Sequence, residues 1–247
     1  MVAPLLSLVL PMWNEERRVR AGLASAFSFR EHYGSELEIL LVDDGSTDKS
    51  PEIAATIPGI RLLREPHRGK GGALRAGLRA ARAPDVLFCD LDWSVNPQET
   101  TRLLANPGEL VIAVREGHGA RRLGEPLFRH LIGRGFNHLV RGLILDGHED
   151  TQCGCKLLRG PRVKELFSSL TMEGWAFDVE LLVAAHAQGI AVHEHPVVWE
   201  YQPDTRLRLG LDALAMTRDL LRIRHNLRSG VYRSAHTGIQ HADQSSR

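Results

Sequence analysis

Short apolar runs alternate with helix-like stretches through the first half of the chain. Five runs rich in Val, Ile and Leu have the length of buried strands, at 5–10, 37–42, 60–63, 85–89 and 110–114. Helical periodicity occupies 15–29, 48–56 and 70–82 between them. Strands that alternate with helices are typical of a parallel sheet whose faces are covered by helices. The pattern therefore predicts a doubly wound α/β sheet.

The pattern becomes helical after Arg115. Over 127–145, six apolar residues fall roughly on one helical face and arginines fall on the other. The six are Leu127, Leu131, Phe136, Leu139, Val140 and Leu143. A helix is predicted for this segment.

Toward the C-terminus we expect a helix over 178–188, a strand over 191–199 and an amphipathic helix over about 208–228. The polar residues from Ser229 onward predict a disordered tail. The expected organisation is one α/β domain at 1–205, a basic amphipathic helix at 206–228 and a disordered tail at 229–247.

Bulk composition narrows the functional classes only slightly. A chain of 247 residues with 43% hydrophobic residues can bury one large core, and its net charge of +1 gives no argument for a nucleic-acid partner. Its three cysteines form no CxxC pair, which favours the reducing cytoplasm. The apolar N-terminal stretch is too short for a membrane span and lacks a basic leader, so we expect neither a signal peptide nor a transmembrane helix.

Polar clusters follow three of the expected strands directly. They are "PMWNEE" after the first strand, "DDGSTD" after the second and "DLD" after the fourth. In open parallel sheets ligands bind at the carboxyl ends of the strands, so these clusters are expected to meet in one crevice. The G-x-G-x-x-G motif of dinucleotide sites is absent after the first strand, and Lys70 lacks the flanking residues of a P-loop.

Asp90 and Asp92 place two carboxylates at the end of one strand. Alternation along an extended chain sends both to the same side, where each raises the pKa of the other. A divalent cation that carries a nucleotide diphosphate would balance their charge, and hard oxygen ligands suit Mg²⁺ or Mn²⁺. We predict Asp92 as the direct metal ligand and Asp90 nearer to the ribose or to the water shell of the metal. The alternative is a turn with two solvated carboxylates.

Motifs along the chain resemble a known enzyme family. The stretches "LSLVLPMWNEE", "ILLVDDGSTDKS", "HRGKGGALRAGLRAA" and "DLD", in this order, resemble the family 2 glycosyltransferases of the GT-A fold. The stretches "DTQCGCKLLRG", "FSSLTMEGWAFDVELL" and "PVVWEY" resemble the dolichyl-phosphate β-glucosyltransferase branch of polyprenyl-phosphate glycosyltransferases. The resemblance covers roughly residues 5–225 and implies a GT-A type α/β fold with a mostly parallel central sheet.

The resemblance implies a nucleotide site in the first half of the chain. Its expected members are Pro11, Asn14, Glu15, Asp43, Arg68, Lys70 and Asp90. Within this set, Asp43 would accept a hydrogen bond from the base or ribose, and the glycines around Lys70 would let the backbone approach the nucleotide. A capping turn explains "DDGSTD" equally well, and both readings can hold together.

The resemblance places the sugar and acceptor in the second half. The residues expected there are Arg115, Arg129, Asp150, Gln152, Lys156, Trp175 and Arg206. Arg115 and Arg129 would hold the acceptor phosphate, since guanidinium groups match phosphate oxygens. Asp178 aligns with the acidic residue that many members use as a base, and Glu180 would support it. Trp175 and Phe177 fit either a sugar pocket or the core.

The predicted activity is inverting transfer of a hexose from a nucleotide-diphosphate sugar, UDP-glucose first, to a polyprenyl phosphate. The catalytic residues would be Asp92, Asp178 and Arg129. A phosphate acceptor is already anionic and needs no strong base, whereas a hydroxyl acceptor would require Asp178 as the base. The alternatives are transfer to a hydroxyl of a soluble metabolite, which the unusual Leu91, Trp93 and Ser94 leave open, and a non-catalytic sugar-nucleotide-binding protein.

The basic C-terminal helix raises the question of membrane contact. Residues 206–228 hold six arginines and two aspartates among many leucines. That composition fits a helix lying on an anionic membrane surface, and equally a helix packed on the domain. We therefore expect a cytoplasmic protein with peripheral contact to the inner face of the membrane as one of two outcomes.

Overall fold

The computed structural model describes residues 3–145, 147–203 and 211–233, with the side chains of 211–214 left out. A seven-stranded sheet in the order β3-β2-β1-β4-β7-β5-β8 forms its centre, and β7 alone runs antiparallel to its neighbours. Its strands are β1 (Leu6–Met12), β2 (Leu37–Asp44), β3 (Arg61–Glu65), β4 (Asp85–Phe88), β5 (Leu110–Val114), β7 (Lys156–Leu158) and β8 (Val192–Pro196). The short strands β6 (Arg121–Leu123) and β9 (Val198–Glu200) pair in parallel as a second sheet. A mostly parallel α/β sheet is confirmed.

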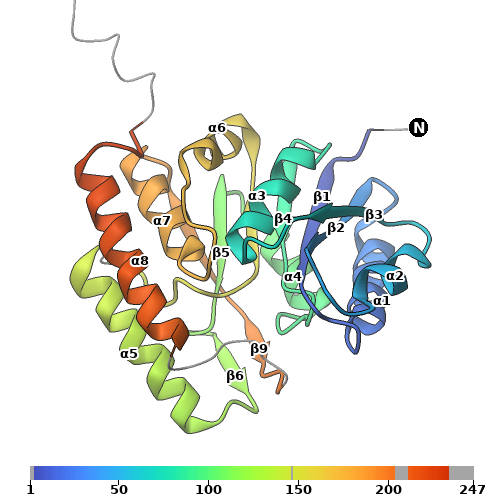
Figure 1. The fold of residues 1–247 in the computed structure, drawn as a ribbon, viewed down its shortest axis with the longest axis horizontal. Coiled ribbons are helices and arrows are strands. Elements are labelled where there is room, and N and C mark those ends of the chain that lie inside the picture. Colours follow the sequence, from blue (N-terminus) through green and yellow to red (C-terminus); the bar gives the residue numbers. More distant parts are fainter. Residues whose placement is uncertain (1–2, 146, 204–210, 234–247) are drawn as a thin grey trace, which may run out of the picture.

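Helices cover both faces of the central sheet (Figure 1). One face packs against α1 (Val19–Tyr33), α2 (Ser50–Ala55) and α4 (Pro97–Leu104). The other packs against α3 (Lys70–Ala80), α6 (Gly160–Leu166) and α7 (Phe177–Ala187), with α5 (Leu127–Leu143) and α8 (Leu211–Arg228) farther out. A single 3₁₀ turn, Phe167–Ser169, follows α6. The strands β1, β2, β4 and β5 are nearly continuous apolar runs because both of their faces are buried, whereas the edge strands β3 and β8 carry polar and partly exposed residues.

Strand register brings the polar clusters to one edge of the sheet. Met12 of β1 pairs with Asp43 of β2, and Asp44 pairs with Glu65 of β3. On the other side of β1, Val9 pairs with Phe88, two residues before Asp90. The convergence that the sequence predicted is therefore confirmed.

Two predicted elements differ from the structure. The strand expected over 191–199 is wrong as a single element, because the chain leaves the central sheet after Pro196 and resumes as β9 in the second sheet. The helix predicted over 127–145 is confirmed for Leu127–Leu143, but its single apolar face is wrong. Phe136, Val140 and Leu143 face the core, whereas Leu127, Leu131 and Leu139 are exposed.

The C-terminal part is described as far as Arg233. The helix predicted over 208–228 is present from Leu211, and Leu220 and Ile223 pack into the core beside α7. Tyr232 is fully buried, so a disordered tail starting at Ser229 is corrected for residues 229–233. Residues 234–247 lie outside the described residues. Within the described ranges, no helix combines the length and apolar character needed to span a bilayer.

Candidate active site

The loops after β1 and β2 are joined by side-chain hydrogen bonds. Asn14 adopts a left-handed backbone conformation with φ of 54°, and its Oδ1 accepts hydrogen bonds from the backbone N–H of Thr47 at 2.8 Å and of Asp48 at 3.3 Å. In return, the hydroxyl of Ser50 accepts a hydrogen bond from the backbone N–H of Glu15 at 2.6 Å. Pro11, in β1, lies beside β2. The expected nucleotide loops therefore form one rigid unit.

The two aspartates that end β2 are buried and have different partners. Asp43 accepts a hydrogen bond from the backbone N–H of Ser46, which is the predicted capping turn, and lies 3.7 Å from Nε of Arg64. Asp44 accepts hydrogen bonds from the backbone N–H of Arg68 and of Gly69, both at 2.8 Å. Asp44 thus fixes the loop that precedes Lys70.

An aromatic pair beside these loops was not predicted. His67 Nδ1 lies 2.8 Å from the carboxylate of Asp44, and its ring stacks on Trp13 with centroids 4.6 Å apart. Trp13 stands in "PMWNEE" and His67 is the first residue of "HRGKGG", but only the fold brings these two stretches together. They add a flat surface next to the predicted nucleotide loop.

The Asp90–Asp92 pair lies on a tight turn rather than on an extended strand. β4 ends at Phe88, and the backbone N–H of Trp93 donates to the carbonyl of Asp90 at 3.1 Å. Trp93 itself has φ of 50°, and its indole N–H donates to the carbonyl of Gly22. Gly154 lies directly under Asp90, since a Cβ at this position would be 1.8 Å from Oδ2. Glycine at 154 therefore leaves room for the Asp90 carboxylate.

The charge on this turn is only partly compensated. Burial and the Asp90 carboxylate raise the pKa of Asp92, against the hydrogen bond that it accepts from the backbone N–H of Ser94. Nζ of Lys70 lies 3.0 Å from Asp90. Two partly buried carboxylates with surplus negative charge suit a hard divalent cation. Among the described residues, no group of three or more His, Cys, Asp or Glu side chains is placed to hold a metal, so the remaining ligands would have to come from a diphosphate and water.

Asp178 is buried between two lysines. Its Oδ1 lies 2.6 Å from Nζ of Lys156, and its Oδ2 lies 3.5 Å from Nζ of Lys70. Burial alone would raise the pKa of Asp178, but Lys156 and Lys70 together lower it. Lys156 is itself fully buried and also donates to the carbonyl of Cys153 at 2.6 Å. An ionised carboxylate held in this way is a weak proton acceptor and a strong anchor for the two lysines.

Trp175, Phe177 and Glu180 are neighbours of Asp178 in the sequence, but not all of them belong to the site. Lys70 lies over the ring of half-buried Trp175, 5.8 Å from its centroid, so Trp175 borders the site. Phe177 is fully buried in the core. Glu180 accepts hydrogen bonds from Thr171, Met172 and Tyr232. The expected support of Asp178 by Glu180 is corrected, because Glu180 fixes the 171–172 loop and the C-terminal segment instead.

Arg115 and Asp150 bind each other. Nε and one terminal nitrogen of Arg115 donate to the two oxygens of Asp150 at 2.7 and 2.8 Å, which lowers the pKa of Asp150 despite its burial. The guanidinium groups of Arg115 and Arg122 lie 5.5 and 5.7 Å from the ring centroid of Trp199. The backbone N–H of Gln152 donates to Asp150 at 3.1 Å. Asp150 therefore orients Arg115 and the start of the "TQCG" segment.

Arg129 begins the helix α5 and reaches the end of the second sheet. Its guanidinium donates to the hydroxyl of Tyr201 at 3.2 Å and lies 5.3 Å from the centre of that ring. Trp199 and Tyr201 were missed by the sequence reasoning, although "PVVWEY" carries both. Arg206 lies outside the described residues.

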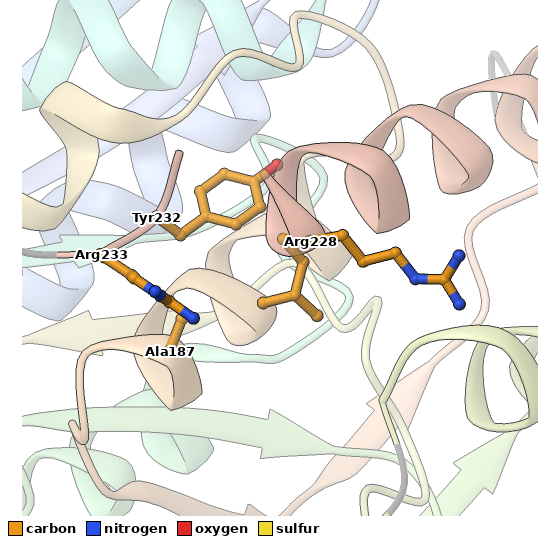
Figure 2. Close-up of a pocket in the computed structure, with 5 residues that line it drawn as sticks. Ala187, Arg228, Tyr232 and Arg233 are labelled. Carbon is orange, nitrogen blue, oxygen red and sulfur yellow. The ribbon is translucent and has the colours of Figure 1, made fainter. Parts of the chain in front are cut away.

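One cavity borders the turn that carries Asp90, and a second lies apart from it. A small cleft borders the acidic turn Asp90–Asp92 and is lined by Cys89, Asp90, Trp93, Ser94, Val95, Gly154, Cys155 and Trp199. The ring of Trp199 is the one that Arg115 and Arg122, here called the arginine cluster, contact. A larger open cavity of about 410 Å³ lies where α7 and α8 end, lined by Ala187, Leu227, Arg228, Tyr232 and Arg233 (Figure 2). Because Asp178 is in the first turn of α7 and Ala187 in its last, this larger cavity is separate from the acidic site.

Comparisons with known proteins show the family. A family model described as "Glycosyl transferase family 2" matches residues 7–159. The dolichyl-phosphate beta-glucosyltransferase of Saccharomyces cerevisiae is 32% identical over 255 residues, covering 92% of this chain and 76% of the relative. The enzyme of the same name from Homo sapiens is 33% identical over 256 residues, covering 94% of this chain and 78% of the relative.

Solved structures share the fold. The glucosyl-3-phosphoglycerate synthase of Mycobacterium tuberculosis in complex with uridine-diphosphate superposes with a TM-score of 0.64 at 24% identity, over 91% of this chain and 80% of that chain. A crystal structure described as a mycobacterial protein gives a TM-score of 0.69 at 25% identity, over 90% of this chain and 75% of that chain. The GT-A type fold expected from the sequence is confirmed.

Proposed function

Because this chain belongs to glycosyl transferase family 2, we propose that it transfers glucose from UDP-glucose to a polyprenyl phosphate. The observation that carries this proposal is the match to dolichyl-phosphate beta-glucosyltransferases over 92–94% of the chain. The matched region includes both the acidic turn, Asp90–Asp92, and the arginine cluster, Arg115 and Arg122. Glycosyltransferase activity is common to the family, whereas the donor and the acceptor are the proposal.

The acidic turn is the proposed site of a divalent metal. Asp92 would be the direct ligand and Asp90 would lie nearer to the ribose or to the metal-bound water. A related fold, that of the Mycobacterium tuberculosis synthase, was crystallised with Mn²⁺ and UDP, which supports Mn²⁺ or Mg²⁺ here. Such an ion would stabilise the negative charge on the departing nucleotide diphosphate.

Lys70 is the proposed partner of the diphosphate on the protein side. It lies between Asp90, Asp178 and the ring of Trp175. Asn14, Glu15, Asp43 and Arg68 remain the proposed residues for the rest of the nucleotide. Asp178 would keep Lys70 and Lys156 charged and correctly placed.

The acceptor phosphate is proposed to bind between Arg115 and Arg129. Asp150 and Trp199 orient Arg115, and Tyr201 orients Arg129. Since Lys156 and Lys70 lower the pKa of Asp178, this carboxylate is a weak base for a hydroxyl acceptor. A phosphate is already ionised at neutral pH, so this environment favours a polyprenyl phosphate over a hydroxyl.

The proposed location is the cytoplasm, with peripheral contact to the inner face of the membrane. Cys89, Cys153 and Cys155 are free thiols in the structure, which agrees with a reducing compartment.

A transfer assay with defined donors and acceptors tests this function. UDP-glucose and GDP-mannose are each offered with undecaprenyl phosphate in detergent, or with 3-phosphoglycerate, with and without a chelator. We expect glucosyl transfer to undecaprenyl phosphate from UDP-glucose only, abolished by chelation and restored by Mn²⁺. Preferential transfer to 3-phosphoglycerate would replace the proposed acceptor, and full activity with the chelator would remove the metal.

A further inference from the structure

Trp93 has an unusual backbone conformation directly after the proposed metal ligand. Its φ is 50°, in the left-handed region that bulky side chains rarely adopt. Among the residues that the structure describes, Trp93 and Asn14 are the two non-glycine residues with positive φ, and both lie in loops of the candidate site. Strained residues of this kind persist only where surrounding contacts hold them, and they cluster at functional sites. The contacts that hold Trp93 are therefore a guide to its role.

The indole of Trp93 is bound to helix α1. Its Nε1–H donates to the carbonyl of Gly22 at 2.8 Å, and this hydrogen bond is buried. The ring of Trp93 lies 6.0 Å from that of Phe29, which also belongs to α1. A buried indole N–H needs a partner of this kind, because leaving it unpaired costs free energy. The hydrogen bond therefore holds the ring in one orientation.

Gly22 also contacts the turn itself. A Cβ at this position would lie 2.4 Å from the carbonyl oxygen of Leu91, so only glycine leaves room for the turn. Glycine inside a helix lowers the stability of the helix, and α1 carries it where the turn approaches most closely. One residue of α1 thus accepts the indole of Trp93 and lies against the backbone of Leu91. These two contacts flank Asp92 in the sequence.

The chain that follows the acidic turn is held by β9. The backbone N–H of Glu200 donates to the carbonyl of Ser94 at 2.8 Å, and Val95 forms an antiparallel bridge with Trp199. The turn is therefore attached to α1 through its own residues and to β9 through the residues after it. This double attachment leaves the backbone of Asp92 little freedom to move.

Rigid support suits a pair of like charges. Asp90 and Asp92 repel each other, and Nζ of Lys70, 3.0 Å from Asp90, only partly balances them. On a flexible turn the two carboxylates would separate, and a cation would have to order them again at a cost in binding free energy. A turn held by α1 avoids this cost, because the ligand oxygens are in place before the cation binds.

We propose that Trp93 is a positioning residue for the cation-binding turn: its indole, hydrogen-bonded to Gly22 of α1, holds the Asp92 carboxylate in place before the cation and the diphosphate bind. This inference rests on the proposed function in one respect, because the cation at Asp92 belongs to that proposal. In this role Trp93 acts through Asp92 and not on the substrate. Loss of the hydrogen bond should therefore weaken cation binding and leave the chemistry at saturating cation intact.

Binding of Mn²⁺ in the presence of UDP tests this role without any acceptor. Electron paramagnetic resonance of the free ion gives the dissociation constant of Mn²⁺ for the full-length chain. Trp93→Phe keeps a buried aromatic ring and removes the N–H donor, and Gly22→Ala places a methyl group against the carbonyl of Leu91. The matched control is Leu6→Val, which perturbs the same core cluster at the amino end of β1, away from the turn.

We expect W93F and G22A each to weaken Mn²⁺ binding about tenfold, the size of effect that groups orienting a metal ligand typically have. L6V should lower the melting temperature and leave the Mn²⁺ affinity unchanged. Wild-type affinity in W93F would overturn the proposal, as would an equal loss of affinity in L6V or a wild type that binds no Mn²⁺ with UDP. Melting curves show whether each variant is folded. If W93F is not, wild-type affinity in G22A would overturn the proposal in its place.

The dependence of activity on Mn²⁺ separates positioning from folding. In transfer from UDP-glucose to undecaprenyl phosphate, W93F should need about tenfold more Mn²⁺ for half-maximal rate and should approach the wild-type kcat at saturating Mn²⁺. A lower kcat with an unchanged Mn²⁺ requirement would overturn the positioning role, because it would report only a loss of folded enzyme. If W93F weakens Mn²⁺ binding but the wild type glucosylates no undecaprenyl phosphate, the positioning role stands and the proposed acceptor falls.

Discussion

Two aspartates near the same edge of the sheet lie in opposite electrostatic environments. Asp92 is on a turn where burial and the neighbouring Asp90 raise its pKa. Asp178 is more deeply buried, yet Lys156 and Lys70 lower its pKa. In the first environment Lys70, at 3.0 Å from Asp90, only partly balances two carboxylates, whereas in the second two lysines face one carboxylate. Surplus negative charge therefore supports the proposed cation-binding position at Asp92, whereas a paired buried carboxylate organises its neighbours.

The largest effect should follow removal of the main partner of Asp178. Lys156→Met leaves a buried carboxylate with only the more distant Lys70, so the free energy of unfolding should fall by about 3–5 kcal/mol. Urea denaturation measures this loss. Lys164→Met is the matched control, because Lys164 donates to the neutral carbonyl of Ala83 and should cost about 1 kcal/mol. Equal losses in both variants would contradict the pairing.

Removal of the charge on Asp92 should impair catalysis rather than folding. Asp92→Asn is expected to lower kcat/KM by roughly 10²–10³-fold, because charge stabilisation of the leaving diphosphate is lost. Asp85→Asn, at the amino end of β4, is the matched control and should keep its activity. Steady-state kinetics over a Mn²⁺ titration measures kcat/KM for both variants. An Asp92→Asn enzyme with wild-type kcat/KM would contradict the assignment of Asp92 as a metal ligand.

Gly154→Ala tests the space under Asp90. The added Cβ would meet the carboxylate of Asp90, which is the far end of a flexible side chain and can swing away. We expect kcat/KM to fall about tenfold, because the carboxylate is displaced, while stability changes by less than about 1 kcal/mol. Gly133→Ala, on α5 with open space around it, should leave kcat/KM unchanged. Unimpaired G154A would show that the position of Asp90 is not critical.

The smallest effect is a pH-dependent difference in stability. The raised pKa of Asp92 means that its ionised form destabilises the fold at neutral pH, and that this penalty disappears as pH falls below the unfolded value near 3.8. Asp92→Asn should therefore be more stable than the wild type at pH 7, with a smaller difference near pH 4. Urea denaturation at the two pH values checks the sign. A difference that grows toward low pH would contradict the environment described for Asp92.

The sequence alone predicted the contacts that are set by neighbouring residues in the chain or by the ends of strands. The five apolar runs became β1 to β5, and the register of parallel strands placed Asp43, Asp44 and Asp90 at one edge. The like-charge effect between Asp90 and Asp92 also followed from their spacing alone. A turn here was the stated alternative to an extended pair, but its conformation did not follow from the sequence, because Trp93 takes a left-handed conformation that the pattern does not encode.

Contacts across long separations were beyond the sequence. Lys156 meets Asp178, and Arg115 meets Asp150, only because β7 inserts between β4 and β5. The short antiparallel β7 has too few residues for a periodic signal. Glu180 was assigned to the site because it stands two residues from Asp178, yet the helical turn aims it at Thr171 and Tyr232.

By itself, the sequence determined the α/β architecture, the family and the edge where the acidic groups meet, because alternation of strands and helices and short motifs are local properties. Tertiary structure decided the charge state of Asp178, the orientation of Arg115 and the direction of each face of α5. Those depend on which distant groups come within a few ångströms and on which surfaces the core leaves uncovered. Leucines at helical spacing, such as those of α5, can face the core or the solvent, and only the packing of the folded chain decides which.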